Sequence, residues 1–330
     1  MKPLGKIIIA CLVIATVAAL ALSIAFAPAN YDPNADLPEK MDFQTSIEGL
    51  SMMENTWQQA LPQTEIYNLI SEHFSSPLAE GKTVKKAIVI GYDGCRVDTF
   101  RLLGQSEKSG INALLKDGGH AVFSFCGGVN YPEKNIQDTS TAPGWSSMLT
   151  GKWAKTFGVT GNGQPKPLEP RTLLLSLVED GTIDSSAFYV SWRGHFSKDN
   201  STYINEKDYI EEKGINSVFL CAGNDEGTVE NVLNDINNAD CSDFIFLTLE
   251  YTDHSGHGSG FSLQNPHYVE GFFSADEQGY EFINAIKSRA TYDTEDWLIL
   301  ITTDHGGKGK HHGKDSFEER MTFIISNKEI

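Results

Sequence analysis

The stretch Ala87-Ile-Val-Ile-Gly-Tyr-Asp-Gly94 joins a short apolar run to a glycine-flanked carboxylate. An apolar, β-branched run that closes in a turn predicts a buried strand ending just before Asp93. Similar apolar runs recur at residues 188–192, 244–249 and 297–302. These runs form the framework from which the fold can be predicted.

Helical patterns occupy the sequence between these runs. Amphipathic stretches lie at residues 111–116, 227–236 and 275–289. Apolar strands that alternate with amphipathic helices predict a mostly parallel central sheet with helices on both faces. We therefore expect an α/β domain over residues 85–330.

The composition limits the classes of function. The chain has 330 residues, of which 40% are hydrophobic, enough for one large or two ordinary domains. Its net charge is −18, from 44 acidic and 26 basic residues. Such a surface repels nucleic-acid phosphates, so we expect no nucleic-acid partner. A phosphate substrate would need a local positive charge, which bound metal ions can supply.

The N-terminus has the pattern of an export signal. Lys2 and Lys6 accompany an apolar run over residues 7–28, which is long enough to span a bilayer as a helix. Residues 1–29 are therefore predicted to be a signal peptide, cleaved near Ala27-Pro-Ala29, or an uncleaved membrane anchor. Either outcome places the body outside the cytoplasm, secreted or held to the membrane by a single N-terminal span.

Residues 30–84 connect this segment to the main domain. Residues 30–40 are polar with two prolines and indicate a linker, and the spacing of apolar residues over 41–76 predicts one or two helices. The five cysteines show no C-x-x-C spacing, which argues against a thiolate metal site. One or two disulfides and buried free thiols are both compatible with their positions.

Candidate metal ligands gather after the predicted strands. In open α/β sheets, ligands bind beyond the carboxyl ends of the strands. The carboxylate and imidazole residues that follow the first, third and fourth runs are Asp93, Asp253, His257, Asp304, His305, His311 and His312. A single aspartate after a strand is usually a turn residue, but several carboxylates at one edge repel each other unless divalent cations balance their charge. Asp and His ligands without Cys suit zinc, or else manganese, and their number suits two ions.

A hydroxyl nucleophile is the remaining requirement. Thr141 lies two residues before Pro143, at the start of an apolar stretch that ends at Gly151. This pattern predicts a helix whose N-terminal N–H groups and dipole favour an anion. The alternative role for this threonine, or for Thr139 or Ser140, is simple N-capping. Beside a metal cluster, we favour Thr141 as the nucleophile.

The order of these residues resembles the alkaline phosphatase superfamily, and more closely its type I phosphodiesterase and nucleotide pyrophosphatase branch. That branch has a threonine nucleophile before an x-Pro step, as in Thr141-Ala-Pro143, and a helix that ends in Thr-Gly, as in Thr150-Gly151. It also has a phosphate-binding asparagine further along the chain, which here is Asn162 in Gly-Asn-Gly. The resemblance covers residues 85–326 and implies an alkaline-phosphatase-like fold.

The resemblance implies a role for each motif residue. Its two sets of zinc ligands would be Asp253, His257 and His312 in one, and Asp93, Asp304, His305 and Thr141 in the other. Asn162 and the backbone N–H of residue 142 would hold the phosphate oxygens. His311 could take the place of His312, but we prefer His312 because it precedes Gly313.

The activity that the resemblance implies is hydrolysis of phosphate diesters or monoesters through a phosphothreonine at Thr141, with a small phosphate ester as substrate. A phosphonate hydrolase, or a phosphoryl or phosphoethanolamine transferase, would use the same metal core, and a non-catalytic surface binding protein would keep only the fold. The branch often has Phe-Pro-Asn-His after the nucleophile, where this chain has Ala142-Pro-Gly-Trp145. The missing ring argues against nucleotide recognition by base stacking. The oligomeric state stays open.

Overall fold

The computed structural model describes residues 42–198 and 201–330. The predicted signal or anchor at residues 1–29 and the predicted linker at residues 30–40 lie outside this part. Within the described residues, no helix combines the length and the apolar character that a membrane span needs.

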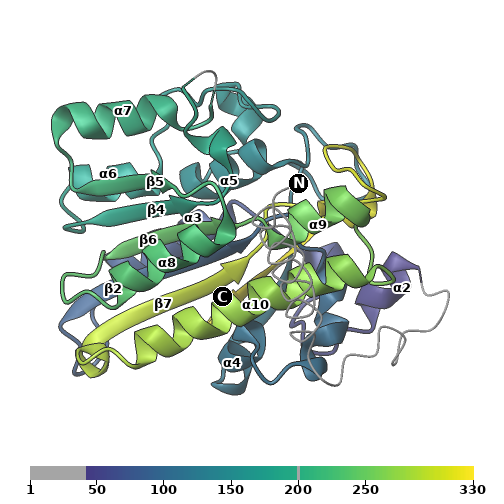
Figure 1. Cartoon of the computed structure of the whole chain (residues 1–330), viewed down its shortest axis with the longest axis horizontal. Helices are drawn as coiled ribbons and strands as arrows, with labels where there is room; N and C mark the ends of the chain where they lie inside the picture. Colours follow the sequence, from purple (N-terminus) through teal and green to yellow (C-terminus); the bar gives the residue numbers. More distant parts are fainter. Residues whose placement is uncertain (1–41, 199–200) are drawn as a thin grey trace, which may run out of the picture.

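An eight-stranded sheet forms the centre of the described fold (Figure 1). Of these strands, β8 alone runs antiparallel to its neighbours. The strands are β1 (Leu61–Pro62), β2 (Val84–Tyr92), β3 (His120–Phe125), β4 (Ser186–Val190), β5 (Ser217–Cys221), β6 (Phe244–Leu249), β7 (Glu295–Thr302) and β8 (Met321–Ser326). Their order across the sheet is β1-β3-β8-β7-β2-β6-β4-β5. Ile88 of β2 pairs with Ile245 of β6 and with Ile299 of β7. The carboxyl ends of these three parallel strands therefore lie at the same edge.

Helices cover both faces of the sheet. On one face lie α2 (Phe43–Glu48), α4 (Gly110–Lys116), α8 (Asp225–Ile236) and α10 (Pro266–Lys287). On the other lie α3 (Glu65–Ser75), α5 (Thr141–Thr150), α6 (Leu173–Glu179) and α7 (Ile204–Lys213). The remaining elements are α9 (Tyr251–Ser259), α11 (Phe317–Arg320) and the 3₁₀ turns η1 (Trp57–Gln59), η2 (Val97–Gln105), η3 (Ala154–Phe157), η4 (Arg193–His195) and η5 (Tyr292–Thr294).

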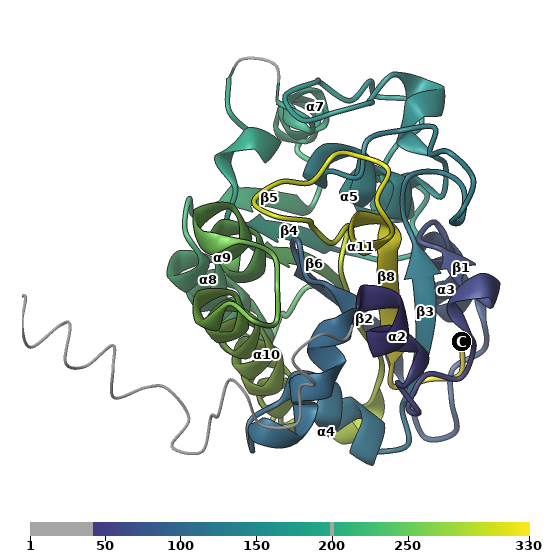
Figure 2. The same ribbon diagram turned by 90° about the vertical axis from the view of Figure 1, so that its right-hand side faces the viewer.

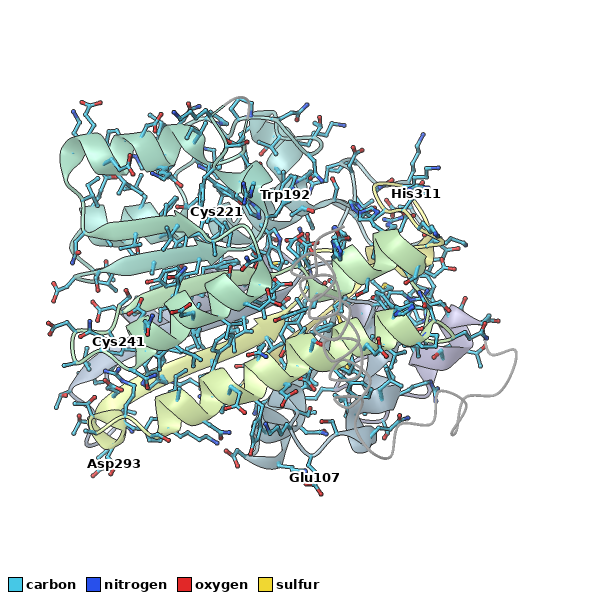
Figure 3. All side chains as sticks on the ribbon, viewed as in Figure 1. Glu107, Trp192, Cys221, Cys241, Asp293 and His311 are labelled. Atoms are coloured by element: carbon cyan, nitrogen blue, oxygen red, sulfur yellow. The ribbon has the colours of Figure 1, made fainter. Side chains whose placement is uncertain are left out.

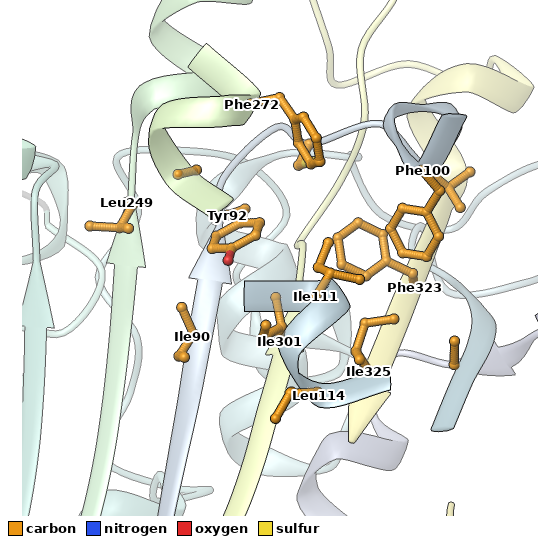
Figure 4. Packing of buried hydrophobic residues seen from close by; sticks show 14 of the residues in the cluster. Ile90, Tyr92, Phe100, Ile111, Leu114, Leu249, Phe272, Ile301, Phe323 and Ile325 are labelled. Atoms are coloured by element: carbon orange, nitrogen blue, oxygen red, sulfur yellow. The ribbon is translucent and has the colours of Figure 1, made fainter. Parts of the chain in front are cut away.

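Strand β2 contributes to two hydrophobic cores at once. Ile88 and Ile90 belong to the core under α4, α8 and α10, whereas Ala87 and Val89 belong to the core under α3, α5 and α6. The division follows from strand geometry, because successive side chains point to opposite faces. Figure 4 shows the first core, where Ile90 and Ile111 of α4 lie on the same side of the sheet. Burial on both faces explains why the run is continuously apolar instead of alternating.

The predicted α/β class with a mostly parallel sheet is confirmed. The runs at residues 87–90, 244–249 and 297–302 fall within β2, β6 and β7, and the run at 188–192 overlaps β4, which ends at Val190. The strands β1, β3, β5 and β8 were not predicted. β1 has two residues, and β3 and β5 begin with polar residues, so their patterns are weak.

Three further expectations can be compared with the structure. The helix predicted from residue 275 begins at Pro266, because Asn265 caps it by accepting from the N–H of His267, and proline suits the first helical position. The described cysteines are free thiols, which is the second of the two alternatives: Cys95, Cys126, Cys221 and Cys241. The predicted helices in residues 41–76 are α2 and α3.

A buried carboxyl joins α10 to the rest of this layer. Oδ1 of Asp276 accepts from the backbone N–H of Ile111 at the start of α4, at 3.0 Å, and from the hydroxyl of Tyr92, at 3.4 Å. The side chain is 1% exposed. Burial raises the pKa of Asp276 to about 6.

This pKa predicts a pH-dependent effect of Asp276→Asn on stability. The stabilising contribution of the protonated carboxyl is present below its unfolded pKa of about 4 and is lost as the pH rises through about 6. The free energy of unfolding of the wild type, minus that of the variant, should therefore fall by roughly 3 kcal/mol over that range. Urea denaturation of both proteins at pH 4.5, 5.5, 6.5 and 7.5 measures this difference. A difference that does not change with pH would contradict the assignment.

Candidate metal centre

The sequence-predicted ligands come together at the carboxyl edge of the sheet. Asp93 follows β2, and the short helix α9 after β6 carries Asp253 and His257. Asp304 and His305 follow β7, and His312 lies in the loop between β7 and α11. Figure 2 looks onto this edge, where that loop, drawn in yellow, lies between α9 and α5. Parallel strands bring these segments together although they are far apart in the sequence.

One group of ligand atoms comes from Asp93, Asp304 and His305. The Nε2 atom of His305 lies 3.4 Å from Oδ1 of Asp93 and 3.4 Å from Oδ2 of Asp304. All three side chains are fully buried. Their ligand atoms lie within 4.8 Å of one another, close enough to bind one ion. This group matches one of the two sets that the sequence predicts, apart from Thr141.

A second group comes from Asp253, His257 and His312. The Nε2 atoms of His257 and His312 are 3.0 Å apart. Oδ2 of Asp253 lies 3.4 Å from Nε2 of His257, and its Oδ1 lies 3.6 Å from Nε2 of His312. The rings of His305 and His312 stack with centroids 4.0 Å apart, so the two groups adjoin. The sequence predicts these three residues as a ligand set; the ligand atoms of Asp253, His305 and His312 also lie within 4.8 Å of one another, so His305 is close to both groups.

Backbone carbonyls orient the three imidazoles. In each ring, Nδ1 faces a backbone carbonyl. The distances are 2.7 Å for His305 and Gly306, 3.1 Å for His312 and Thr139, and 2.9 Å for His257 and Lys310. A carbonyl only accepts, so Nδ1 carries the proton and Nε2 of each neutral ring offers a lone pair. Facing lone pairs repel, and a cation between them removes the repulsion. Ligating histidines are commonly held in this way.

In Asp93 and in Asp304, one carboxylate oxygen accepts a hydrogen bond from the protein and the other has no partner among the described residues. Oδ2 of Asp93 accepts from the indole of Trp145 at 3.0 Å, and Oδ1 of Asp304 accepts from the N–H of Gly94 at 3.2 Å. Among the described residues, the opposite oxygens have no hydrogen-bond partner, and neither do Oδ1 of Asp253 and Nε2 of His305. Buried polar atoms without partners are costly, so four of them facing one centre fit divalent cations.

Electrostatics gives the same answer. Burial, together with the charge of Asp304, raises the pKa of Asp93 well above its usual range, and burial raises the pKa of Asp304 in the same way. Burial raises the pKa of Asp253 to about 6 and lowers the pKa of His312 to about 4. The centre therefore disfavours charge on its own groups when no cation balances it. Removal of a cation would leave protons on the carboxylates.

Two glycines let separate elements approach the ligands closely. Gly94 has φ +66, and a Cβ there would lie 2.9 Å from the Cβ of Asp253. A Cβ at Gly144 would lie 2.7 Å from the Cβ of Asp304. Glycine at both positions thus allows α9 and the first turn of α5 to pack directly on the metal centre.

Thr141 is the first residue of α5 and is 3% exposed. The N-capping alternative is not what the structure shows: Ser140, the N-cap residue, makes no side-chain capping hydrogen bond, and the hydroxyl of Thr139 donates to the carbonyl of Lys314. The backbone N–H of residue 142 donates instead to Oδ1 of Asn162, at 2.9 Å. The two groups predicted to hold phosphate are thus neighbours. A phosphate oxygen that accepted from this N–H would replace Asn162 Oδ1.

Sequence reasoning missed two residues at the centre. A ligand atom of Glu250 lies within 4.8 Å of those of Asp93 and Asp253, and burial raises its pKa well above the usual range. Glu250 directly follows β6, so the rule that located Asp253 could also have found it. Trp145 carries no such signal, because its contact with Asp93 depends on how α5 packs. His311 is exposed (labelled in Figure 3), and it is not among the groups of side chains whose ligand atoms lie within 4.8 Å of one another in the described residues.

A cavity of about 820 Å³ lies at the opposite edge of the sheet, near Cys241 (Figure 3). Nζ of Lys86, which lines it, donates to the carbonyl of Cys241 at 2.7 Å and to Asp243 at 3.1 Å, and none of its lining residues has a buried polar side-chain atom without a partner among the described residues. The cavity therefore lacks the unpartnered ligand atoms of the metal centre.

Several solved structures are similar to parts of this chain, among them the following three. Murine ectonucleotide pyrophosphatase/phosphodiesterase 5, in an inactive form with AMP, is 18% identical with a TM-score of 0.45, over 68% of this chain and 57% of that chain. The phosphonate monoester hydrolase of Agrobacterium radiobacter is 12% identical with a TM-score of 0.46, over 73% and 68%. The alkaline phosphatase of the Antarctic bacterium TAB5 is 9% identical with a TM-score of 0.45, over 74% and 91%. No curated protein matches the chain.

The described chain combines an α/β fold with a cluster of candidate metal ligands at the carboxyl edge of its sheet. The model of the type I phosphodiesterase / nucleotide pyrophosphatase family matches residues 87–317, which is more than half of the chain. The chain belongs to this family.

The centre predicts that zinc stabilises the protein more at higher pH. The raised pKa of the carboxyls, about 6 for Asp253, keeps protons on the ligands at low pH, and these protons compete with zinc. The gain in free energy of unfolding should be roughly 4 kcal/mol when free zinc is a thousand times its Kd. Melting temperatures with zinc and with EDTA, compared at pH 5.5 and pH 7.5, should differ more at pH 7.5. Equal melting curves with and without EDTA would count against the centre.

The geometry also distinguishes the two adjacent histidines. His312→Ala should weaken zinc binding by at least roughly tenfold, because Nε2 of His312 faces His257 and Asp253. His311→Ala is the matched control and should bind zinc as the wild type does, since this side chain is exposed. Competition with a fluorescent chelator measures both affinities. The reverse order would assign the ligand to His311.

Proposed function

We propose that this protein is an exported two-zinc phosphoesterase that hydrolyses phosphate diesters or monoesters through a phosphothreonine at Thr141. The observation that carries the proposal is the set of buried ligand atoms without partners at one sheet edge, beside the first turn of α5. Zinc fits this set because the ligands are imidazoles and carboxylates without thiolates. Export is proposed from the apolar run at residues 7–28.

Each group of ligands would hold one cation. Asp253, His257 and His312 form one group, and Asp93, Asp304 and His305 form the other, to which we assign Thr141 as a further ligand. Two bound cations would act as Lewis acids that stabilise negative charge on the attacking and leaving oxygens. The carboxylates and imidazoles of the chain hold these positions before substrate arrives, since the carbonyls, Gly94 and Trp145 already orient them.

The position of Thr141 suits a nucleophile. As the first residue of α5, it lies where unpaired N–H groups and the helix dipole favour an anion. Its oxygen would attack phosphorus in line, so that a bond from Oγ1 to phosphorus forms as the bond to the leaving oxygen breaks. Water would then cleave the phosphothreonine and restore the hydroxyl. The N–H of Ala142 and the amide of Asn162 would hold phosphate oxygens during both steps.

The substrate would be a small phosphate ester. Ala142, next to the nucleophile, offers no ring on which a base could stack, so we do not propose nucleotide specificity. The acidic surface, with a net charge of −18, argues against a nucleic-acid substrate. A phosphonate hydrolase, a phosphoethanolamine transferase and a non-catalytic binding protein remain as outcomes of the test.

Turnover of two chromogenic esters tests the proposal. The chain from Tyr31 onward, with zinc, should hydrolyse p-nitrophenyl phosphate or bis-p-nitrophenyl phosphate, and EDTA should abolish this activity. Thr141→Ala should lower kcat on the order of 10⁴-fold or more, because it removes the nucleophile. Thr141→Ser is the matched control, which keeps a hydroxyl and should retain measurable turnover.

The outcomes separate the alternatives. The preferred ester would identify the protein as a diesterase or a monoesterase. No turnover of either ester by a zinc-loaded protein would favour a phosphonate substrate, a transferase or a binding protein. A protein that binds no zinc would overturn the proposal.

A further inference from the structure

Trp145 connects the nucleophile helix to a metal ligand. It lies one turn into α5, and its indole Nε1–H donates to Oδ2 of Asp93 at 3.0 Å. The other oxygen of Asp93, Oδ1, has no hydrogen-bond partner in the described chain and lies 3.4 Å from Nε2 of His305. The indole thus occupies one oxygen and leaves the other facing the cation site.

The surroundings of the indole fix its direction. Trp145 is completely buried, and its ring meets that of Phe246 edge to face, with centroids 5.7 Å apart. A Cβ at Gly91 would lie 2.5 Å from Cη2 of the indole, so the absence of a side chain there makes room for the ring. An indole N–H can only donate. The contact therefore holds the carboxylate of Asp93 in a single orientation.

The same helix carries Thr141 and Trp145 four residues apart. Side chains at this spacing lie on one face of a helix. Because Trp145 reaches Asp93, the face that holds Thr141 is directed to the same edge. Gly144 lies in the turn between them, and it is so close to Asp304 that a Cβ there would be 2.7 Å from the Cβ of Asp304. This turn therefore packs directly on the metal centre. One hydrogen bond thus relates the position of the hydroxyl to the position of a ligand.

We propose that Trp145 is a positioning residue, which presents Oδ1 of Asp93 to the cation and holds α5 in register with the metal centre. This inference rests on the metal centre of the proposed function. Partners that orient a ligand in this way typically change metal affinity by roughly 10- to 100-fold when removed.

Two substitutions separate hydrogen bonding from packing. Trp145→Phe keeps an aromatic ring but loses the donor. Trp145→His loses more volume, but its Nε2 can occupy the place of the indole nitrogen in the five-membered ring. If packing alone matters, both stability and zinc affinity should be higher for Trp145→Phe. If the hydrogen bond matters, zinc affinity should be higher for Trp145→His although its metal-free stability is lower.

Trp297→Phe is a matched control. Trp297 is also buried, and its indole also donates to a carboxylate, Oε2 of Glu295 at 2.8 Å. This contact lies at the start of β7, at the opposite edge of the sheet. The substitution should lower stability without changing zinc affinity.

The experiment measures zinc affinity and stoichiometry for the full-length protein by competition with a chelator, and metal-free melting in EDTA. We expect Trp145→Phe to weaken one of two zinc sites by roughly 10- to 100-fold, and Trp145→His to lie closer to the wild type. Wild-type affinity in Trp145→Phe would overturn the inference and leave the proposed function intact. If Trp145→Phe does not fold, the test uses Trp145→His alone. A folded Trp145→His that has lost zinc binding would then also overturn the inference. A wild type that binds no zinc removes both proposals.

Discussion

The structure depends on the burial of three carboxylates at one place. Asp93, Asp253 and Asp304 lie together at the sheet edge, and within the described residues their ion pairs are to histidines alone. Burying an ion without a partner costs several kcal/mol, so such a cluster exists only with bound cations or with protons on its oxygens. The raised pKa values of these carboxyls correspond to the state with protons on the oxygens. Much of the surrounding chain holds the carboxylates in the geometry that suits bound cations.

The sheet can hold this cluster because it is rigid beneath it. β2, β6 and β7 are parallel and in register, with hydrophobic cores on both faces. A ligand placed after each strand therefore starts from a fixed position. Gly94 and Gly144 then allow α9 and α5 to approach more closely than side chains would permit. The cores supply the stability that the polar edge does not.

A second set of contacts orients the ligand atoms of these side chains toward the cation sites. Backbone carbonyls hold Nδ1 of each histidine, so that Nε2 faces inward. Trp145 and Gly94 do the same for Asp93 and Asp304 by occupying the outer oxygen. These contacts join segments that are distant in the sequence, and they relate the centre to the helix that begins at Thr141.

The sequence by itself determined the fold class and the ligand types. A short apolar run rich in aromatic and β-branched residues, such as 244–249, predicts a buried strand. Residues that follow parallel strands share an edge, so Asp253 and Asp304 could be placed together without coordinates. Only the tertiary structure decided the antiparallel direction of β8, the contact of Trp145 with Asp93, and the inward position of His312 beside an exposed His311. The physical reason is how far apart in the sequence the residues lie that decide each feature. Strand burial and chain order are properties of short segments, whereas the direction of a side chain depends on how elements distant in the sequence pack against each other.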